Sequence, residues 1–235
     1  MSQREQRLIV VEKKKFKLND LMPVSGMTAN QGLALDSLLS SRHTCLIGSA
    51  GTGKTFLALY AALRKVLDPS SPVSKVVVVR SAVAVRDIGF LPGTEDEKMA
   101  IYELPYSSIC TELLSYKSAW STLKRLELAS FMSTSYVRGI TLDDTIVIVD
   151  EAQNLSAHEL DSVASRLGCN SELMICGDYI QSDLRRSDRA GFKDFLKVLT
   201  SLNSVDVVSF EDEDIVRSGF VKEYIIARNK IGLDV

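Results

Sequence analysis

Short apolar runs alternate along the chain with longer segments in which apolar residues recur at helical spacing. Four of the runs are uninterrupted, and two of them consist almost entirely of β-branched residues, which is typical of strands buried on both faces of a parallel sheet. These four runs are residues 43–47, 75–80, 145–149 and 173–176, and a further run at 205–210 predicts a fifth strand. The pattern predicts strands spread over most of the chain.

Helical patterns fill the segments between these runs. Thr28 is expected to cap a helix that continues to Leu38, and residues 56–67 are expected to form a second helix. Residues 95–130 read as helical and irregular, and residues 135–138 as a short strand. Strands that alternate with helices predict an α/β fold, in which a mostly parallel sheet with right-handed crossovers carries helices on both faces.

Length and composition are those of one globular domain. The chain has 235 residues, of which 46% are hydrophobic and 25% are charged. We expect residues 1–27 to be an extended lead-in and residues 28–235 to be a single domain. No apolar run approaches the roughly 18 residues that span a bilayer, and the charged N-terminus is not a secretory signal. These features predict a cytoplasmic protein with no membrane partner.

Charge and cysteine content give no support to global nucleic-acid attraction or to a zinc site. The net charge of −2 gives no global attraction to nucleic acid, and the lysine run at 13–17 reads as a solvated tail rather than a binding arm. The four cysteines form no CxxC pair, which favours buried free thiols over a zinc site.

The strongest chemical motif follows the first predicted strand. It has the pattern GxxxxGK[ST] and consists of Gly48, Ser49, Ala50, Gly51, Thr52, Gly53, Lys54 and Thr55. Between a buried strand and a helix, such a loop wraps phosphate groups with its backbone N–H groups, aided by the positive end of the helix. Lys54 is expected to reach the β and γ oxygens, and the Thr55 hydroxyl to ligate Mg²⁺.

A pair of carboxylates ends the strand at 145–149. Asp150 is expected to hold Mg²⁺ through water, and Glu151 to orient and activate the attacking water, which favours hydrolysis over simple switching. The next strand leads to Gln181, a candidate γ-phosphate sensor whose alternative is a solvent-facing turn residue. The sequence therefore predicts a phosphate loop NTPase that uses Mg²⁺.

Taken together, these motifs resemble the ATPase core of superfamily 1 helicases and, more narrowly, the PhoH family. The resemblance rests on residues 48–55, 150–154, 177–181, 79–80, 88–93, 97–98, 136–139 and 214–217. It implies a RecA-like ATPase that assembles as a homo-oligomeric ring, expected to be a hexamer, and acts on RNA or single-stranded DNA. It also places Gln31 where helicases read adenine, which makes ATP the expected nucleotide. Ser81 departs from the family pattern, which often has proline there.

A single RecA-like domain lacks a second domain that could supply a cation to the γ-phosphate. A neighbouring subunit could supply it, and an arginine provided in this way accelerates GTPases by roughly 10³ to 10⁵. Arg217 is the first candidate because it follows the last predicted strand, with Arg138 and Arg80 as the others. The alternative for each is a structural ion pair.

Other functions remain open at this level. The aromatic and basic residues between 102 and 125 favour an ordinary helical surface over a platform for single strands. A nucleotide-gated binding module without a motor role and, less readily, a small-molecule kinase would also use the phosphate loop.

Overall fold

One parallel sheet forms the centre of the molecule. The computed structural model describes residues 16–40, 42–81, 95–178 and 189–231. Within these residues, six strands pair in the order β3-β2-β4-β5-β1-β6, and every neighbouring pair is parallel. The strands are β1 (His43–Gly48), β2 (Lys75–Arg80), β3 (Ala129–Ser133), β4 (Thr145–Val149), β5 (Glu172–Gly177) and β6 (Val205–Phe210). The predicted RecA-like α/β fold is confirmed.

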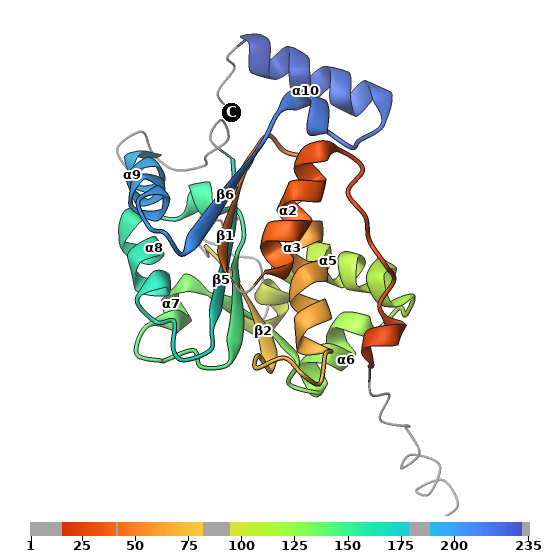
Figure 1. The fold of residues 1–235 in the computed structure, drawn as a ribbon, viewed down its shortest axis with the longest axis vertical. Helices are drawn as coiled ribbons and strands as arrows, with labels where there is room; N and C mark the ends of the chain where they lie inside the picture. The colour runs from red at the N-terminus through yellow and green to blue at the C-terminus, as the bar shows by residue number, and fades with distance from the viewer. Residues whose placement is uncertain (1–15, 41, 82–94, 179–188, 232–235) are drawn as a thin grey trace, which may run out of the picture.

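Helices cover both faces of this sheet (Figure 1). On one face lie α2 (Ala29–Leu39), α3 (Lys54–Val66), α5 (Glu95–Leu114) and α6 (Ala119–Arg125). On the other face lie α7 (Thr134–Val137), α8 (Ala157–Ala164) and α9 (Arg189–Thr200), while α10 (Gly219–Ile231) lies beyond the carboxyl end of β6. Short 3-10 turns are η1 (Leu18–Asp20), η2 (Ala152–Asn154) and η3 (Asp212–Asp214). No helix in the described ranges combines the length and apolarity needed to cross a membrane.

The sheet divides the hydrophobic core into two clusters. Because side chains alternate along a strand, Val76 and Val78 of β2 enter the cluster under α3 and α5, whereas Val77 and Val79 enter the cluster under α8 and α9. The strands β2 and β4 are therefore apolar at every central position, which explains their β-branched runs.

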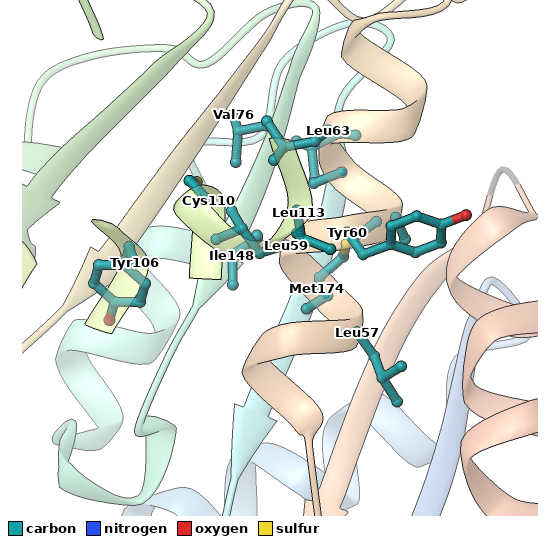
Figure 2. Close-up of a cluster of buried hydrophobic side chains, with 14 of the residues drawn as sticks. Leu57, Leu59, Tyr60, Leu63, Val76, Tyr106, Cys110, Leu113, Ile148 and Met174 are labelled. Atoms are coloured by element: carbon teal, nitrogen blue, oxygen red, sulfur yellow. The ribbon is translucent and has the colours of Figure 1, made fainter. Parts of the chain in front are cut away.

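Helix α3 is the most enclosed helix on its face. Seven consecutive residues, from Leu57 to Leu63, are buried between the sheet, α2 and α5. Figure 2 shows Leu59 and Leu63 from α3 packed beside Ile148 of β4 and Leu113 of α5. Replacing a fully buried leucine such as Leu59 with alanine would cost about 2–5 kcal/mol. This packing fixes the start of α3, which is also the end of the phosphate loop.

Residues 16–27 run across the face that carries α3 and α5. Phe16 and Leu21 belong to the core cluster of that face. The backbone N–H of Met22 donates to the carbonyl of Leu113 in α5 (2.8 Å). The described part of the segment that we expected to be a lead-in is therefore packed against the domain.

Most of the predicted elements are confirmed, including the five strands and the Thr28 cap, whose side chain accepts a hydrogen bond from the Gln31 N–H. The short strand predicted at 135–138 is wrong. Ser133 caps helix α7 by accepting from the Ser135 N–H, so the chain turns into a helix there. The edge strand β3 directly precedes this helix. Its apolar pattern is weak, and it is a strand because it pairs with β2.

Candidate nucleotide-binding site

The sheet topology brings the predicted site residues together. Strands β4, β5 and β1 are neighbours and run in the same direction, so their carboxyl ends lie at one edge of the sheet. The phosphate loop follows β1, the carboxylate pair follows β4, and Asp178 follows β5. Ligands of parallel α/β sheets bind outside this edge.

The phosphate loop depends on two left-handed glycines. Gly51 has φ +84° and Gly53 has φ +86°, a region that strains residues with a Cβ. Gly53 is also the N-cap of α3, so the loop leads directly into the positive end of that helix. Within the loop, the Thr52 hydroxyl donates to the Ser49 carbonyl (3.0 Å). The backbone has the form that binds anions.

Lys54 lies across its own loop. Its ammonium group donates to the carbonyls of Gly48 (2.7 Å) and Ser49 (2.8 Å), and to the Thr52 hydroxyl (3.3 Å). Burial lowers the pKa of Lys54, and nearby acidic groups that include Asp178, Glu151 and Asp150 oppose this effect. A phosphate bound in the loop would take over the hydrogen bonds that the carbonyls now accept.

Asp150 is held by two hydroxyl groups. Thr55 Oγ1 donates to Asp150 Oδ1 (2.7 Å), and the hydroxyl of Tyr106 in α5 donates to Asp150 Oδ2 (2.8 Å). Asp150 is only 4% exposed. Burial and the neighbouring Asp150 raise the pKa of Tyr106, which keeps this phenol a donor. A carboxylate beside a hydroxyl offers the oxygen ligands that Mg²⁺ prefers, so Asp150 and Thr55 fit this ion.

Glu151 is oriented by a glutamine two residues away. Its backbone is left-handed (φ 50°), which costs a residue with a Cβ about 1–2 kcal/mol. Gln153 Nε2 donates to Glu151 Oε2 (2.6 Å), while Gln153 Oε1 accepts from the Asp178 N–H (3.0 Å). Gln153 thus ties the carboxylate after β4 to the backbone after β5.

These groups surround one cavity of about 720 Å³. Its walls come from the phosphate loop, the ends of β2, β4 and β5, helix α5 and the segment before α2. The lining residues that carry charge are Lys54, Arg80, Glu112, Asp150, Glu151, Asp178 and Arg217. The volume is within the ordinary range for a small-molecule site.

Two of the three candidate arginines lie at this cavity. Arg217 is exposed and packs over Gly51 of its own chain, so closely that a Cβ on that glycine would lie 2.8 Å from Arg217 Cγ. Burial alone lowers the pKa of Arg80, but Tyr106 and the nearby carboxylates raise it overall. Arg138 is exposed at the end of α7 and does not line the cavity.

Gln31 is bound at both ends of its amide. Its Nε2 donates to the Thr52 carbonyl (3.0 Å), and its Oε1 accepts from the Met27 N–H (2.8 Å). Gln31 therefore joins the phosphate loop to the segment before α2, and reading a base would require it to exchange these partners. Its predicted role with adenine stays a prediction. Gln181, the predicted sensor, lies outside the described residues.

A clasp behind the loop involves Ser49, Asp212 and Asn229. The Ser49 hydroxyl donates to Asp212 Oδ1 (3.2 Å), and Asn229 Nδ2 donates to both Ser49 Oγ and Asp212 Oδ1 (3.1 Å each). The Val216 N–H adds a bond to the Gly51 carbonyl (3.0 Å). Through these contacts η3 and α10 hold the loop.

Sequence reasoning assigned no role in the site to three of these residues, although Gln153 lies in the motif at 150–154. Gln153 stands two places after Glu151, and that proximity is the signal that could have indicated it. Tyr106 and Asn229 come from helices far from the loop in sequence, and neither belongs to a complete motif. Tyr106 and Trp120 are buried, at 0% and 4% exposure, so neither belongs to the helical surface expected for this region.

Comparison with known proteins gives one consistent result. The family described as PhoH-like protein matches residues 23–228. A PhoH-like protein of Mycobacterium bovis is 31% identical over 206 residues, which cover 85% of this chain and 56% of that protein. A PhoH-like protein of Bacillus subtilis is 33% identical over 187 residues, which cover 78% of this chain and 57% of that protein.

Among solved structures, the large terminase of a thermophilic bacteriophage in complex with ADP has a TM-score of 0.48 and 13% identity, covering 86% of this chain and 49% of that one. That likeness is too low to bear on function, and the fold rests on the sheet itself. The chain spans somewhat more than half the length of the curated relatives above. The family match over most of the chain agrees with the motifs gathered at one sheet edge, and the chain belongs to the PhoH-like protein family.

Proposed function

We propose that this chain is a Mg²⁺-dependent ATPase that works in the cytoplasm as a homo-oligomeric ring, expected to be a hexamer, on RNA or single-stranded DNA. Family and fold already make the chain a P-loop NTPase. The activity, substrates and partners of the longer relatives are only proposed for this chain.

One observation carries the proposal of hydrolysis. The Thr55 hydroxyl and Asp150 carboxylate are in contact (2.7 Å), and Glu151 lines the same cavity as Lys54. These four side chains come from two different loops and meet only in the folded chain. A phosphate loop alone would serve binding, whereas an oriented carboxylate beside it also serves the activation of water.

Each residue has a distinct part in this reaction. The loop N–H groups and Lys54 bind the phosphate oxygens of the nucleotide, and Asp150 with Thr55 would hold the metal. When bound, Mg²⁺ supplies positive charge that offsets the charge developing on the phosphate oxygens. Glu151, fixed by Gln153, orients the attacking water and accepts its proton. ATP is proposed as the nucleotide on the strength of Gln31 and the family resemblance.

Steady-state ATP hydrolysis by the purified chain tests this function. We expect turnover that EDTA abolishes and that Glu151→Gln lowers by about 10² to 10⁴, the usual contribution of a general base. Nucleotide binding by Glu151→Gln should be retained, as measured with a fluorescent ATP analogue. Lys54→Ala provides the background. Turnover of the unmodified chain no higher than that of Lys54→Ala would refute the ATPase.

Mixing two inactive variants tests whether a neighbouring subunit completes the site. Arg138 is exposed and does not line the cavity of its own chain, so Arg138→Ala mixed with Lys54→Ala should recover activity if Arg138 acts on the next subunit. Arg217 packs on its own loop, and the same mixing with Arg217→Ala separates action within the chain from action between chains. Full activity of a monomer, shown by mass measurement under assay conditions, would refute the ring.

The nucleic-acid partner has a separate test. ATP hydrolysis should rise when single-stranded RNA or DNA is added, and the stimulation should weaken as salt increases because phosphate contacts release counterions. The polymer that stimulates more strongly is the preferred one. The same rate with and without either polymer would refute this part of the proposal.

A nucleotide-gated binding module is the second candidate, and the clasp behind the loop favours it. Ser49 bonds to Asn229 of α10, whose exposed residues Phe220 and Tyr224 stack on each other. A loop that changes conformation on nucleotide binding could thereby shift the position of α10. Turnover that Glu151→Gln abolishes without loss of binding distinguishes the ATPase from this module.

A further inference from the structure

Helix α5 contributes one side chain to the edge of the sheet where the nucleotide site lies. Tyr106 has no exposed surface, and its ring packs near Trp120 of α6 (6.0 Å between ring centroids) and Phe131 of β3 (5.8 Å). Figure 2 shows it at one end of the buried cluster, apart from the leucines of α3. The ring is thus fixed by packing, and its hydroxyl has a defined direction.

That hydroxyl is one link in a chain of polar contacts. Arg80, at the end of β2, interacts electrostatically with Tyr106, and the Tyr106 hydroxyl donates to Asp150 Oδ2 (2.8 Å). Arg80 also lines the cavity. A carboxylate can only accept, so the phenol proton is directed to Asp150.

Both oxygens of Asp150 are therefore occupied by hydroxyl donors. Thr55 takes Oδ1 at 2.7 Å and Tyr106 takes Oδ2 at 2.8 Å. Rotation of the carboxylate about its Cβ–Cγ bond would break both bonds. The group is 4% exposed, so water could not readily replace a lost donor. The orientation of Asp150 is set before any ligand arrives.

We propose that Tyr106 is a positioning residue, which holds Asp150 in the orientation that, together with Thr55, receives the Mg²⁺ of the bound nucleotide. This inference rests on the proposed ATPase. Residues that orient metal ligands in this way typically alter metal affinity or activity by about 10- to 100-fold when removed. A phenylalanine would fill the same space, so the hydroxyl serves the carboxylate rather than the packing.

Tyr106→Phe tests the role of the hydroxyl alone. The Mg²⁺ concentration that gives half-maximal ATP hydrolysis should rise about 10- to 100-fold, with kcat recovering at saturating Mg²⁺. The Kd of a non-hydrolysable ATP analogue should be unchanged in EDTA and weaker in Mg²⁺. Tyr60→Phe is the matched control, because Tyr60 is also buried in this cluster and Figure 2 shows its hydroxyl on the side away from Tyr106.

Several outcomes would overturn the role of Tyr106. These are a folded Tyr106→Phe with the unmodified Mg²⁺ curve, an equal shift in Tyr60→Phe, and equal weakening of analogue binding in EDTA and in Mg²⁺. The last two outcomes would mean that the substitution loosens the packing of the protein in general. If Tyr106→Phe does not fold, 3-fluorotyrosine at position 106 keeps the ring and hydroxyl. Its fluorine resonance should move when Mg²⁺ joins the analogue, and an unmoved resonance would count against the role.

The role of Tyr106 and the proposed ATPase activity fail in different ways. An unmodified chain that neither hydrolyses ATP nor binds the analogue more tightly with Mg²⁺ refutes the ATPase, and Tyr106 with it. An unmodified chain with normal Mg²⁺ dependence and a Tyr106→Phe variant identical to it refutes only the role of Tyr106.

Discussion

Gln153 offers a test of how the attacking water is activated. Its amide donates to Glu151 Oε2 (2.6 Å) and accepts from the Asp178 N–H (3.0 Å), and the residue is 4% exposed. Gln153→Leu keeps a similar size and removes both bonds. The Glu151 carboxylate could then rotate away from the orientation in which it positions the attacking water.

The magnitude follows from the bond that is lost. A hydrogen bond to a charged group contributes about 1.5–3 kcal/mol, and about 1.4 kcal/mol corresponds to tenfold in rate. If that bond is needed in the transition state, kcat should fall about 10- to 150-fold. Loss of the bond from the Asp178 N–H should also lower the free energy of unfolding by about 1–3 kcal/mol. The assay must therefore run well below the melting temperature of the variant.

A double variant separates the orienting role from general damage. If Gln153 acts only through Glu151, then Glu151→Gln combined with Gln153→Leu should hydrolyse ATP no more slowly than Glu151→Gln alone. Nucleotide binding, measured with the fluorescent analogue, should stay close to that of the unmodified chain. A kcat of Gln153→Leu within about twofold of the unmodified value would refute the orienting role of Gln153, since hydrolysis would then not need this bond.

Three further predictions concern the surroundings of the site. Lys65→Ala leaves Glu172 buried without its ion-pair partner and should cost about 3–5 kcal/mol in chemical denaturation, whereas Lys65→Met with Glu172→Leu should recover most of it. Asn229→Ala removes one of the two bonds made by the Ser49 hydroxyl and should weaken nucleotide binding about 3- to 10-fold, with an unchanged Kd contradicting the clasp. Burial alone raises the pKa of Asp214, but hydrogen bonds lower it overall. The stability that Asp214 contributes to the folded chain is therefore present above the unfolded pKa and is lost as pH falls through the folded pKa. Asp214→Asn should flatten that acid loss in unfolding curves, and an unaltered curve would contradict this.

The sequence was sufficient for features that depend on local pattern. The β-branched runs of β2 and β4 predicted buried strands because every central position of those strands is covered on both faces. The phosphate loop was recognisable because its glycines and Lys54 must follow one another at fixed spacing to wrap a phosphate. Thr28 was recognisable as a cap for the same local reason.

Contacts with neighbouring elements decided the secondary structure where the local sequence pattern was weak. Residues 129–133 contain two serines and a single large aromatic side chain, and they form β3 because β2 offers an open edge. The segment at 135–138, which resembled a strand, is occupied by α7 because Ser133 caps a helix there. A strand at the edge of a sheet is selected by its neighbour, and that neighbour is remote in sequence.

The sequence by itself determined the chemistry of this protein: a loop for phosphate, a carboxylate pair and the strands that present them. Only the tertiary structure decided how that chemistry is held. Tyr106 reaches Asp150 across 44 positions and Asn229 reaches Ser49 across 180. Hydrogen bonds between side chains of different elements leave no repeating pattern and no fixed spacing in the sequence, because they depend on which surfaces pack together. The residues that orient the site became visible only in the folded chain.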